Sequence, residues 1–232
     1  MTLHQLPIAN KERVIIVGAG IGGLAASLRL SHMGYNVKVF ETAETAGGKL
    51  RTITGQTGEI DIGPTVLTLL PVFQNLFRSV GEDIFDHIEL VRQKIIARHW
   101  WPDGETLDLH DDFESSRDAI LNFSGPESAK EFEKYFYDTR DLFSCFDIPV
   151  MQNPNPSMLD MNRAVLNNPK ILFKMHPLRT LSGLLNYKFR DKRLQQLFGR
   201  YATYVGGSPL ESPALLSLIW QAEARGVWSV KG

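Results

Sequence analysis

Apolar and polar positions at the start of the chain alternate in the order strand, helix, strand. Residues 13–17 (RVIIV) form a nearly continuous apolar run ending at Gly18, which is typical of a strand buried in a parallel sheet. Residues 24–33 are rich in Ala and Leu and precede Gly34, which favours a helix with a glycine C-cap. Residues 36–40 (NVKVF) predict a second strand. The three elements predict a βαβ unit.

The middle of the chain changes from strand patterns to helix patterns. Residues 90–110 predict a β-hairpin with its turn at residues 102–104. Pro126 suits the first position of a helix and opens a long helical stretch, whose aromatic residues have the spacing of a core stripe. Pro213 opens a last helix that ends before Gly226. The second part of the chain is therefore expected to be largely helical.

These elements predict an α/β fold with α+β insertions, in which a Rossmann-like βαβ unit precedes a hairpin and a helical domain. We place the first part of a cofactor-binding domain at residues 1–90 and part of a substrate-binding, membrane-facing domain at residues 91–232. No further strand-helix-strand pattern follows Phe40, although a dinucleotide-binding sheet needs more than two parallel strands. We therefore expect an N-terminal fragment, a truncated gene product or a split half.

Composition narrows the classes of function. Apolar residues make up 43% of the 232 positions and the net charge is −1, so nothing favours a nucleic-acid partner. Cys145 is the single cysteine, which excludes a disulfide framework and a cysteine-based metal site. His99, His110 and His176 are isolated, so no metal is expected. Residues 1–10 have no secretory signal pattern, and no apolar stretch is long enough to cross a bilayer.

A glycine motif lies between the first strand and the helix, and it reads Gly18-Ala19-Gly20-Ile21-Gly22-Gly23. The first glycine permits a tight turn, the second lets the backbone approach a pyrophosphate, and the last lets helix and strand pack closely. The helix N-terminus adds free N–H groups and a positive dipole. We expect a dinucleotide to contact Gly18, Gly20, Ile21, Gly22 and Gly23.

Glu41 ends the second strand, where a carboxylate can accept hydrogen bonds from both ribose hydroxyls of an adenosine. It would repel a 2′-phosphate, which argues against NADP. The alternative is a surface glutamate that merely follows a strand.

A second glycine pair distinguishes FAD from NAD. Gly47 and Gly48 let the backbone pass close to a ligand, and Lys49 and Arg51 supply charge for a pyrophosphate or a flavin edge. A bare NAD site needs none of these residues, so the expected cofactor is FAD. The alternative is a flexible loop with incidental charges.

A glycine-proline corner completes the candidate site. Gly63, Pro64 and Thr65 follow a predicted hairpin, and their backbone could present N–H groups to an isoalloxazine ring. Taken alone, the corner could equally be an ordinary turn.

The motifs together resemble a known superfamily. The segments VIIVGAGIGGLAASLRLSHMGYNVKVFE, AGGKLRT and DIGPTVLT resemble the flavin amine oxidases and phytoene desaturases. The segments ARHWWPDG, RYATYVGGSPLESPALLSLIWQAE and ARGVWSVKG resemble the bacterial carotenoid desaturases, especially the hydroxycarotenoid 3,4-desaturases, or methoxyneurosporene dehydrogenases. The resemblance covers nearly the whole chain, but members of the family are about twice as long.

The resemblance implies an FAD-dependent oxidoreductase of carotenoid biosynthesis that transfers hydride from a carotenoid to the flavin. It implies that Gly18, Gly20, Gly23, Glu41, Gly47, Gly48, Lys49, Arg51, Gly63 and Pro64 surround FAD, and it assigns no catalytic residue. The fragment alone is expected to be inactive. Two alternatives stay open: an amine-oxidase-like flavoenzyme acting on a polar amine, and a non-catalytic FAD-binding fragment.

A lipophilic substrate implies a protein that is cytoplasmic and peripheral on the membrane face. Residues 158–201 are apolar and basic, and within them nine cations accompany the two acids Asp160 and Asp191. Cations beside apolar anchors are typical of an interfacial segment. This segment is the predicted membrane contact, with a pair of core helices carrying solvated lysines as the alternative.

Overall fold

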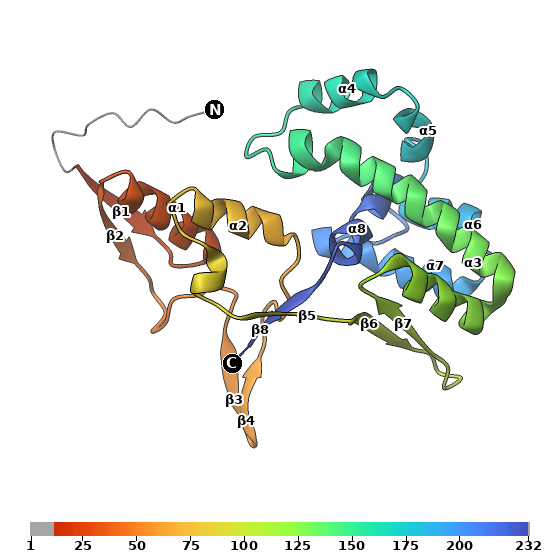
Figure 1. Ribbon diagram of the computed structural model, residues 1–232, viewed down its shortest axis with the longest axis horizontal. Coiled ribbons are helices and arrows are strands. Elements are labelled where there is room, and N and C mark those ends of the chain that lie inside the picture. The colour runs from red at the N-terminus through yellow and green to blue at the C-terminus, as the bar shows by residue number, and fades with distance from the viewer. Residues whose placement is uncertain (1–11, 232) are drawn as a thin grey trace. The chain divides into compact units, whose positions relative to one another are not determined.

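The computed structural model describes residues 12–231, so the prediction about residues 1–10 lies outside the described part. The described residues form two compact units, one of residues 12–91 and 228–231 and the other of residues 92–227 (Figure 1). We call them the first unit and the helical unit. Residues 228–231 return to the first unit at the end of the described chain. The roles given to the two regions stay predictions.

The predicted βαβ unit opens the first unit. Strand β1 (Arg13–Val17), helix α1 (Ile21–His32) and strand β2 (Asn36–Phe40) follow one another, and β1 pairs in parallel with β2 in a register that joins Arg13 to Asn36. The sheet has alternating burial because Ile16 faces α1 at Gly23, whereas Val17 on the opposite face is 85% exposed. One face of this two-stranded sheet is therefore covered by α1 and the other is bare.

The rest of the first unit supplies the candidate loops and a small core. Strands β3 (Thr52–Gly55) and β4 (Gly58–Asp61) form the predicted hairpin. Helix α2 (Leu70–Arg78), the 3₁₀ turn η1 (Ile84–Asp86) and the pair formed by β5 (Leu90–Arg92) with β8 (Trp228–Val230) were not predicted. Buried apolar side chains in residues 12–91 are those of Ala19, Leu70, Val80 and Ile84.

A hairpin and a long broken helix begin the helical unit. Strands β6 (Ile95–Trp100) and β7 (Thr106–His110) form the predicted hairpin, although its first strand starts later because residues 90–92 pair with β8 instead. Helix α3 (Phe113–Phe146) contains one non-helical residue, Gly125, at φ 83° and ψ 177°. Because a side chain disfavours a positive φ and Pro126 follows, the sequence marks this break between two helices.

Short helices pack around α3 (Figure 1). The predicted last helix is divided into a 3₁₀ segment and a single α-helical stretch. The elements are the π-helical turn η2 (Asp147–Met151), α4 (Met158–Asn167), α5 (Ile171–Met175), α6 (Leu181–Lys188), α7 (Lys192–Gly199), the 3₁₀ helices η3 (Arg200–Val205) and η4 (Ala214–Leu218), and α8 (Trp220–Ala224).

An aromatic core holds the helical unit together. Phe132 and Tyr135 of α3 are fully buried, as the predicted core stripe requires, and they pack against Phe198 and Trp220. Phe189 and Phe198 stack with their ring centroids 5.2 Å apart. Buried aromatic side chains contribute large apolar areas, so this unit has a core of its own.

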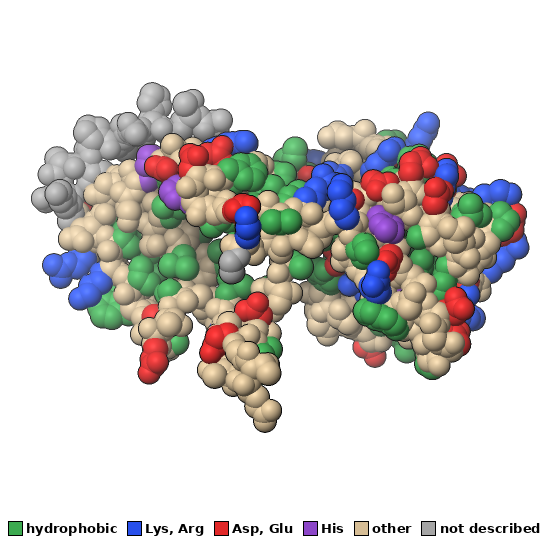
Figure 2. All heavy atoms as spheres, turned by 60° about the horizontal axis from the view of Figure 1, so that its bottom comes forward, with side chains coloured by type: hydrophobic (Ala, Val, Ile, Leu, Met, Phe, Trp, Pro, Cys, Tyr) green, Lys and Arg blue, Asp and Glu red, His purple; other side chains and the backbone are tan. Residues whose placement is uncertain are grey.

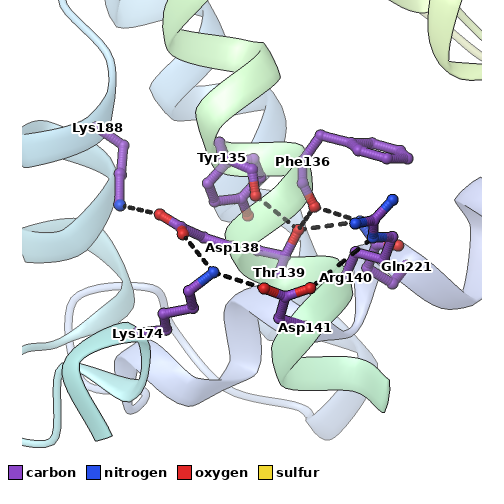
Figure 3. Close-up of polar contacts among 9 residues, drawn as sticks. All are labelled: Tyr135, Phe136, Asp138, Thr139, Arg140, Asp141, Lys174, Lys188 and Gln221. Atoms are coloured by element: carbon purple, nitrogen blue, oxygen red, sulfur yellow. Dashed lines mark hydrogen bonds and ion pairs between the residues drawn. The ribbon is translucent and has the colours of Figure 1, made fainter. Parts of the chain in front are cut away.

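The aromatic core also contains buried polar groups that are hydrogen-bonded to one another. The Thr139 hydroxyl accepts a hydrogen bond from Gln221 Nε2 at 3.0 Å (Figure 3). It accepts a second one from Trp220 Nε1 at 2.8 Å. The same hydroxyl donates to the Tyr135 carbonyl at 2.8 Å.

Within residues 12–231, no helix is long and apolar enough to cross a membrane, and no group of three metal-binding side chains occurs.

Candidate functional site

The turn between β1 and α1 has the geometry that the glycine motif predicts. Gly18 has a φ of +98°, and Gly20 is the N-cap of α1. A Cβ atom at Gly23 would lie 2.0 Å from the Gly18 carbonyl oxygen, so only glycine fits there. Ile21 and Gly22, in the first turn of α1, are exposed. Because the first N–H groups of a helix have no partner within it, they are available to an anion at this turn.

The second glycine pair lies against the first motif. The Gly47 N–H donates to the Ala19 carbonyl at 2.9 Å, and Gly47 forms a bridge with Gly20. A Cβ atom at Gly48 would lie 2.9 Å from the Gly20 Cα. Close approach of the two chain segments therefore requires small residues here, independently of any ligand.

The glycine-proline corner packs against the loop that follows the second glycine pair. A Cβ atom at Gly63 would lie 2.0 Å from the Lys49 carbonyl oxygen, and the adjacent Ile62 N–H donates to the Arg51 carbonyl at 3.0 Å. These contacts fix the corner against the loop that carries Lys49 and Arg51.

Five of the predicted residues surround one hollow. A cavity of about 410 Å³ is lined by Gly48, Lys49, Arg51, Gly63 and Pro64, together with Ile62. Both cations are exposed, and no carboxylate in residues 12–231 lies within ion-pair distance of either. Thr65 follows Pro64 in the chain but does not line the cavity. The hollow therefore has a positive charge that suits an anionic ligand.

The Glu41 side chain binds backbone N–H groups of two loops, the glycine turn after β1 and the segment that follows β2. Its Oε2 accepts the Ala19 N–H at 2.7 Å, and its Oε1 accepts the N–H groups of Thr42 at 2.8 Å and Ala43 at 2.9 Å. These bonds from Ala43, Ala19 and Thr42 lower the pKa of Glu41 from 4.5 to about 2. The carboxylate is therefore ionised at neutral pH. Oε1 also accepts the Thr42 hydroxyl at 3.2 Å, whereas Oε2 has Ala19 as its donor and keeps a lone pair for another.

A buried charged cluster in the helical unit was not predicted. Glu223 is 5% exposed and accepts hydrogen bonds from Arg200 Nη2 at 2.5 Å, from Tyr201 Oη at 2.7 Å and from Tyr204 Oη. Burial and the nearby Arg200 lower the pKa of His99. The signal for this cluster is an arginine and two tyrosines in an otherwise apolar stretch, RYATYV.

The helical unit also contains two hollows. One of about 490 Å³ lies between α3 and α4 beside Cys145 and Arg163, and one of about 430 Å³ lies beside Arg200. Neither was predicted.

Comparison with known proteins supports the geometry of the first unit. Residues 16–82 match the family described as NAD(P)-binding Rossmann-like domain. An oxidoreductase from Methanosarcina mazei has the same fold with a TM-score of 0.58 at 17% identity, over 95% of this chain and 46% of that one. The predicted α/β fold with a Rossmann-like unit is confirmed.

Sequence relatives match both units. Hydroxyneurosporene desaturase from Cereibacter sphaeroides is 44% identical over 220 residues, which cover 95% of this chain and 44% of that protein. Hydroxyneurosporene desaturase from Rhodobacter capsulatus is 42% identical over 96% of this chain and 45% of that protein. The resemblance expected from the motifs is confirmed. The chain is thus a relative of the bacterial hydroxyneurosporene desaturases and spans less than half of their length.

Proposed function

We propose that this chain carries the cofactor-binding part of an FAD-dependent carotenoid desaturase, together with part of its substrate domain. The observation that carries the proposal is the convergence of the first glycine turn, Glu41, the second glycine pair and the Gly63 corner on one side of the βαβ unit. The names of the sequence relatives support the substrate class, a long polyene.

The residues of the first unit fit a dinucleotide. Gly20 and the N–H groups of the first turn of α1 would hold the pyrophosphate, since no side chain there keeps the backbone away from it. Glu41 would accept the adenosine ribose hydroxyls, because its low pKa keeps it charged. Lys49 and Arg51 would bind the anionic or electron-rich part of the cofactor beside Gly63 and Pro64.

In the proposed function the redox chemistry belongs to the flavin, which, when bound, would accept a hydride from the substrate. This chain's own residues bind the cofactor, neutralise its phosphate charge and orient it. The second glycine loop and its two cations favour FAD over NAD because a bare NAD site does not need them. A polyene is insoluble in water, so we further propose that the protein takes its substrate from a membrane surface.

Titration of the purified 232-residue chain with FAD, NAD and NADP tests the cofactor. We expect FAD to bind at least tenfold more tightly than NAD and NADP, with quenching of flavin fluorescence as the measurement. Equal binding of NAD would contradict the assignment of the second loop to FAD.

A chimera tests the activity. Residues 12–231 replace the matched part of the Cereibacter sphaeroides relative, which supplies the remaining length. We expect the chimera to desaturate hydroxyneurosporene and the 232-residue chain alone to be inactive. A folded, flavin-loaded chimera without desaturation would exclude the proposed substrate.

A further inference from the structure

Helix α4 is apolar on the side that faces solvent as well as on the side that faces the protein. Leu159 is 66% exposed and Leu166 is 77% exposed, with the exposed Arg163 between them at helical spacing. Ala164 and Val165 occupy the half-buried side. Packing on α3 therefore explains the inner face and leaves the outer one unexplained.

The same alternation of apolar and basic residues continues through α5. Lys170 is exposed, Phe173 is 81% exposed and Leu178 is 99% exposed. Ile171, at 1% exposure, holds α5 against the unit. We call the set Leu159, Arg163, Leu166, Lys170, Phe173 and Leu178 the α4–α5 surface. Figure 1 shows α4 and α5 together along one side of α3, with the β6–β7 hairpin on the other.

Most of the predicted basic segment is engaged inside the helical unit. Lys174 lies between Asp138 at 3.0 Å and Asp141 at 2.6 Å, and Lys188 contacts Asp138 at 2.6 Å (Figure 3). Burial alone would raise the pKa of Asp138, but the hydrogen bonds from Lys188 and Lys174 outweigh it and lower this pKa. Lys174 and Lys188 therefore fasten α5 and α6 to α3.

Three further cations of the segment also have carboxylate partners. Arg190 contacts Glu131, Arg193 contacts Asp191, and Arg200 contacts Glu223. Basic and acidic side chains are accordingly interspersed over the face of the helical unit in Figure 2. Residues 158–201 as a whole are thus not a free basic surface, and Lys174 is not available for docking.

The cations of the α4–α5 surface differ from these five. Arg163 and Lys170 have no ion-pair partner among residues 12–231. The acid on α4, Asp160, accepts hydrogen bonds from the hydroxyl and N–H of Ser157 in a capping box at the helix start, and the charge of Arg163 also contributes to lowering the pKa of Asp160. The two cations outnumber this one acid. The outer face therefore carries net positive charge between apolar side chains.

We propose that the α4–α5 surface docks the protein on an anionic lipid bilayer. Leu159, Leu166, Phe173 and Leu178 enter the boundary of the acyl chains, and Arg163 and Lys170 stay at the level of the phosphates. A covering protein segment would bury both cations and would need its own acids to compensate for the lost hydration. The use of such docking to collect a polyene rests on the proposed function; the docking itself does not.

Flotation of the 232-residue chain with vesicles tests the surface. Vesicles of phosphatidylglycerol and phosphatidylcholine are compared with phosphatidylcholine alone, and near-UV circular dichroism confirms that each variant is folded. We expect binding to need the anionic lipid and to fall with salt. The triple variant Leu166→Ser, Phe173→Ser, Leu178→Ser should bind at least tenfold more weakly, and each of Arg163→Gln and Lys170→Gln roughly fivefold more weakly.

Two matched variants act as controls. Lys192→Gln removes a cation that also has no ion-pair partner in the described residues but lies outside the surface, and Trp100→Ser removes a 69% exposed apolar side chain from the hairpin. Both should bind vesicles like the wild type. The proposal is overturned if the wild type does not bind, if the surface variants bind normally, or if Trp100→Ser alone abolishes binding. FAD titration of the same preparations shows separately whether the proposed function stands.

Discussion

Gly63 approaches Lys49 so closely that a Cβ atom on Gly63 would lie 2.0 Å from the Lys49 carbonyl oxygen. The contact is between two backbones, so a flexible side chain cannot relieve it. It fixes the corner that lines the cavity with Lys49 and Arg51. The shape of the candidate cofactor site therefore depends on a residue whose role is to have no side chain.

Gly63→Ala should displace the loop of Lys49 and weaken FAD binding by tenfold or more. The displaced loop can no longer present both cations to one ligand. Flavin fluorescence titration measures the effect. Unchanged affinity would mean that this corner lies away from the cofactor.

Gly20→Ala separates ligand contact from packing. An added Cβ would meet nothing closer than the Gly48 Cα at 3.8 Å, which is an ordinary contact. The fold should therefore persist, whereas FAD affinity should fall at least tenfold because the methyl group lies where the pyrophosphate must pass. Isothermal titration of FAD, with thermal unfolding as the check on folding, decides between the two effects. Full flavin occupancy in the variant would refute the assignment.

Gly23→Ala and Gly22→Ala should change stability in opposite directions. The Cβ at position 23 would lie 2.0 Å from the Gly18 oxygen, so helix and strand must separate at a cost of about 1–3 kcal/mol. At position 22 the added Cβ meets nothing within 4 Å, and alanine is the better helix former by about 1 kcal/mol. Urea unfolding of both variants gives the comparison.

Glu41→Gln should weaken FAD roughly tenfold, because a neutral amide is a weaker acceptor than a carboxylate. It should also change the acid sensitivity of the first unit. The folded pKa of Glu41, about 2, lies below the usual 4.5, so its stabilisation is present above pH 4.5 and is lost as the pH falls towards 2. The variant should lose less stability than the wild type across that window in unfolding curves. Parallel losses would show that Glu41 is not the titrating group.

Thr139→Val should destabilise the helical unit more than Thr139→Ser. Valine leaves the buried Trp220 donor without its partner, at about 1–3 kcal/mol, and removes one of the two acceptors of Gln221 Nε2, which keeps the Phe136 carbonyl. Serine keeps the hydroxyl and serves as the matched control. Thermal unfolding followed by near-UV circular dichroism reports the difference, and equal stability of the two variants would count against the network.

The sequence predicted the elements that local rules determine. The βαβ unit, the turn at residues 102–104 and the helix that opens at Pro126 each depend on a residue type that the local backbone demands. The pairing of β5 with β8 was missed because it joins residues far apart in the chain, which periodicity cannot show.

The candidate site was predictable as residue types but not as contacts. Glycines at 47, 48 and 63 were assigned to ligand approach, whereas the structure shows that Gly48 and Gly63 also pack against other backbone segments. The basic segment shows the opposite limit. The excess of basic residues was counted within residues 158–201 alone. That count left out acids on α3, such as Asp138 and Asp141, which form ion pairs with Lys174.

The bare face of the β1–β2 sheet has a consequence for how the molecule opens. Ile15, Val17 and Phe40 remain at least 48% exposed there, so few apolar contacts oppose separation of the two strands. Amide hydrogens of β1 and β2 should therefore exchange with solvent through local opening, long before those of α3 around Tyr135, which exchange only when the aromatic core opens. Native-state hydrogen exchange would resolve the chain into two cooperative folding units of different free energy, with the cofactor site in the weaker one. Binding of FAD should then slow exchange in the first unit selectively, because a ligand protects the part of the fold that it requires.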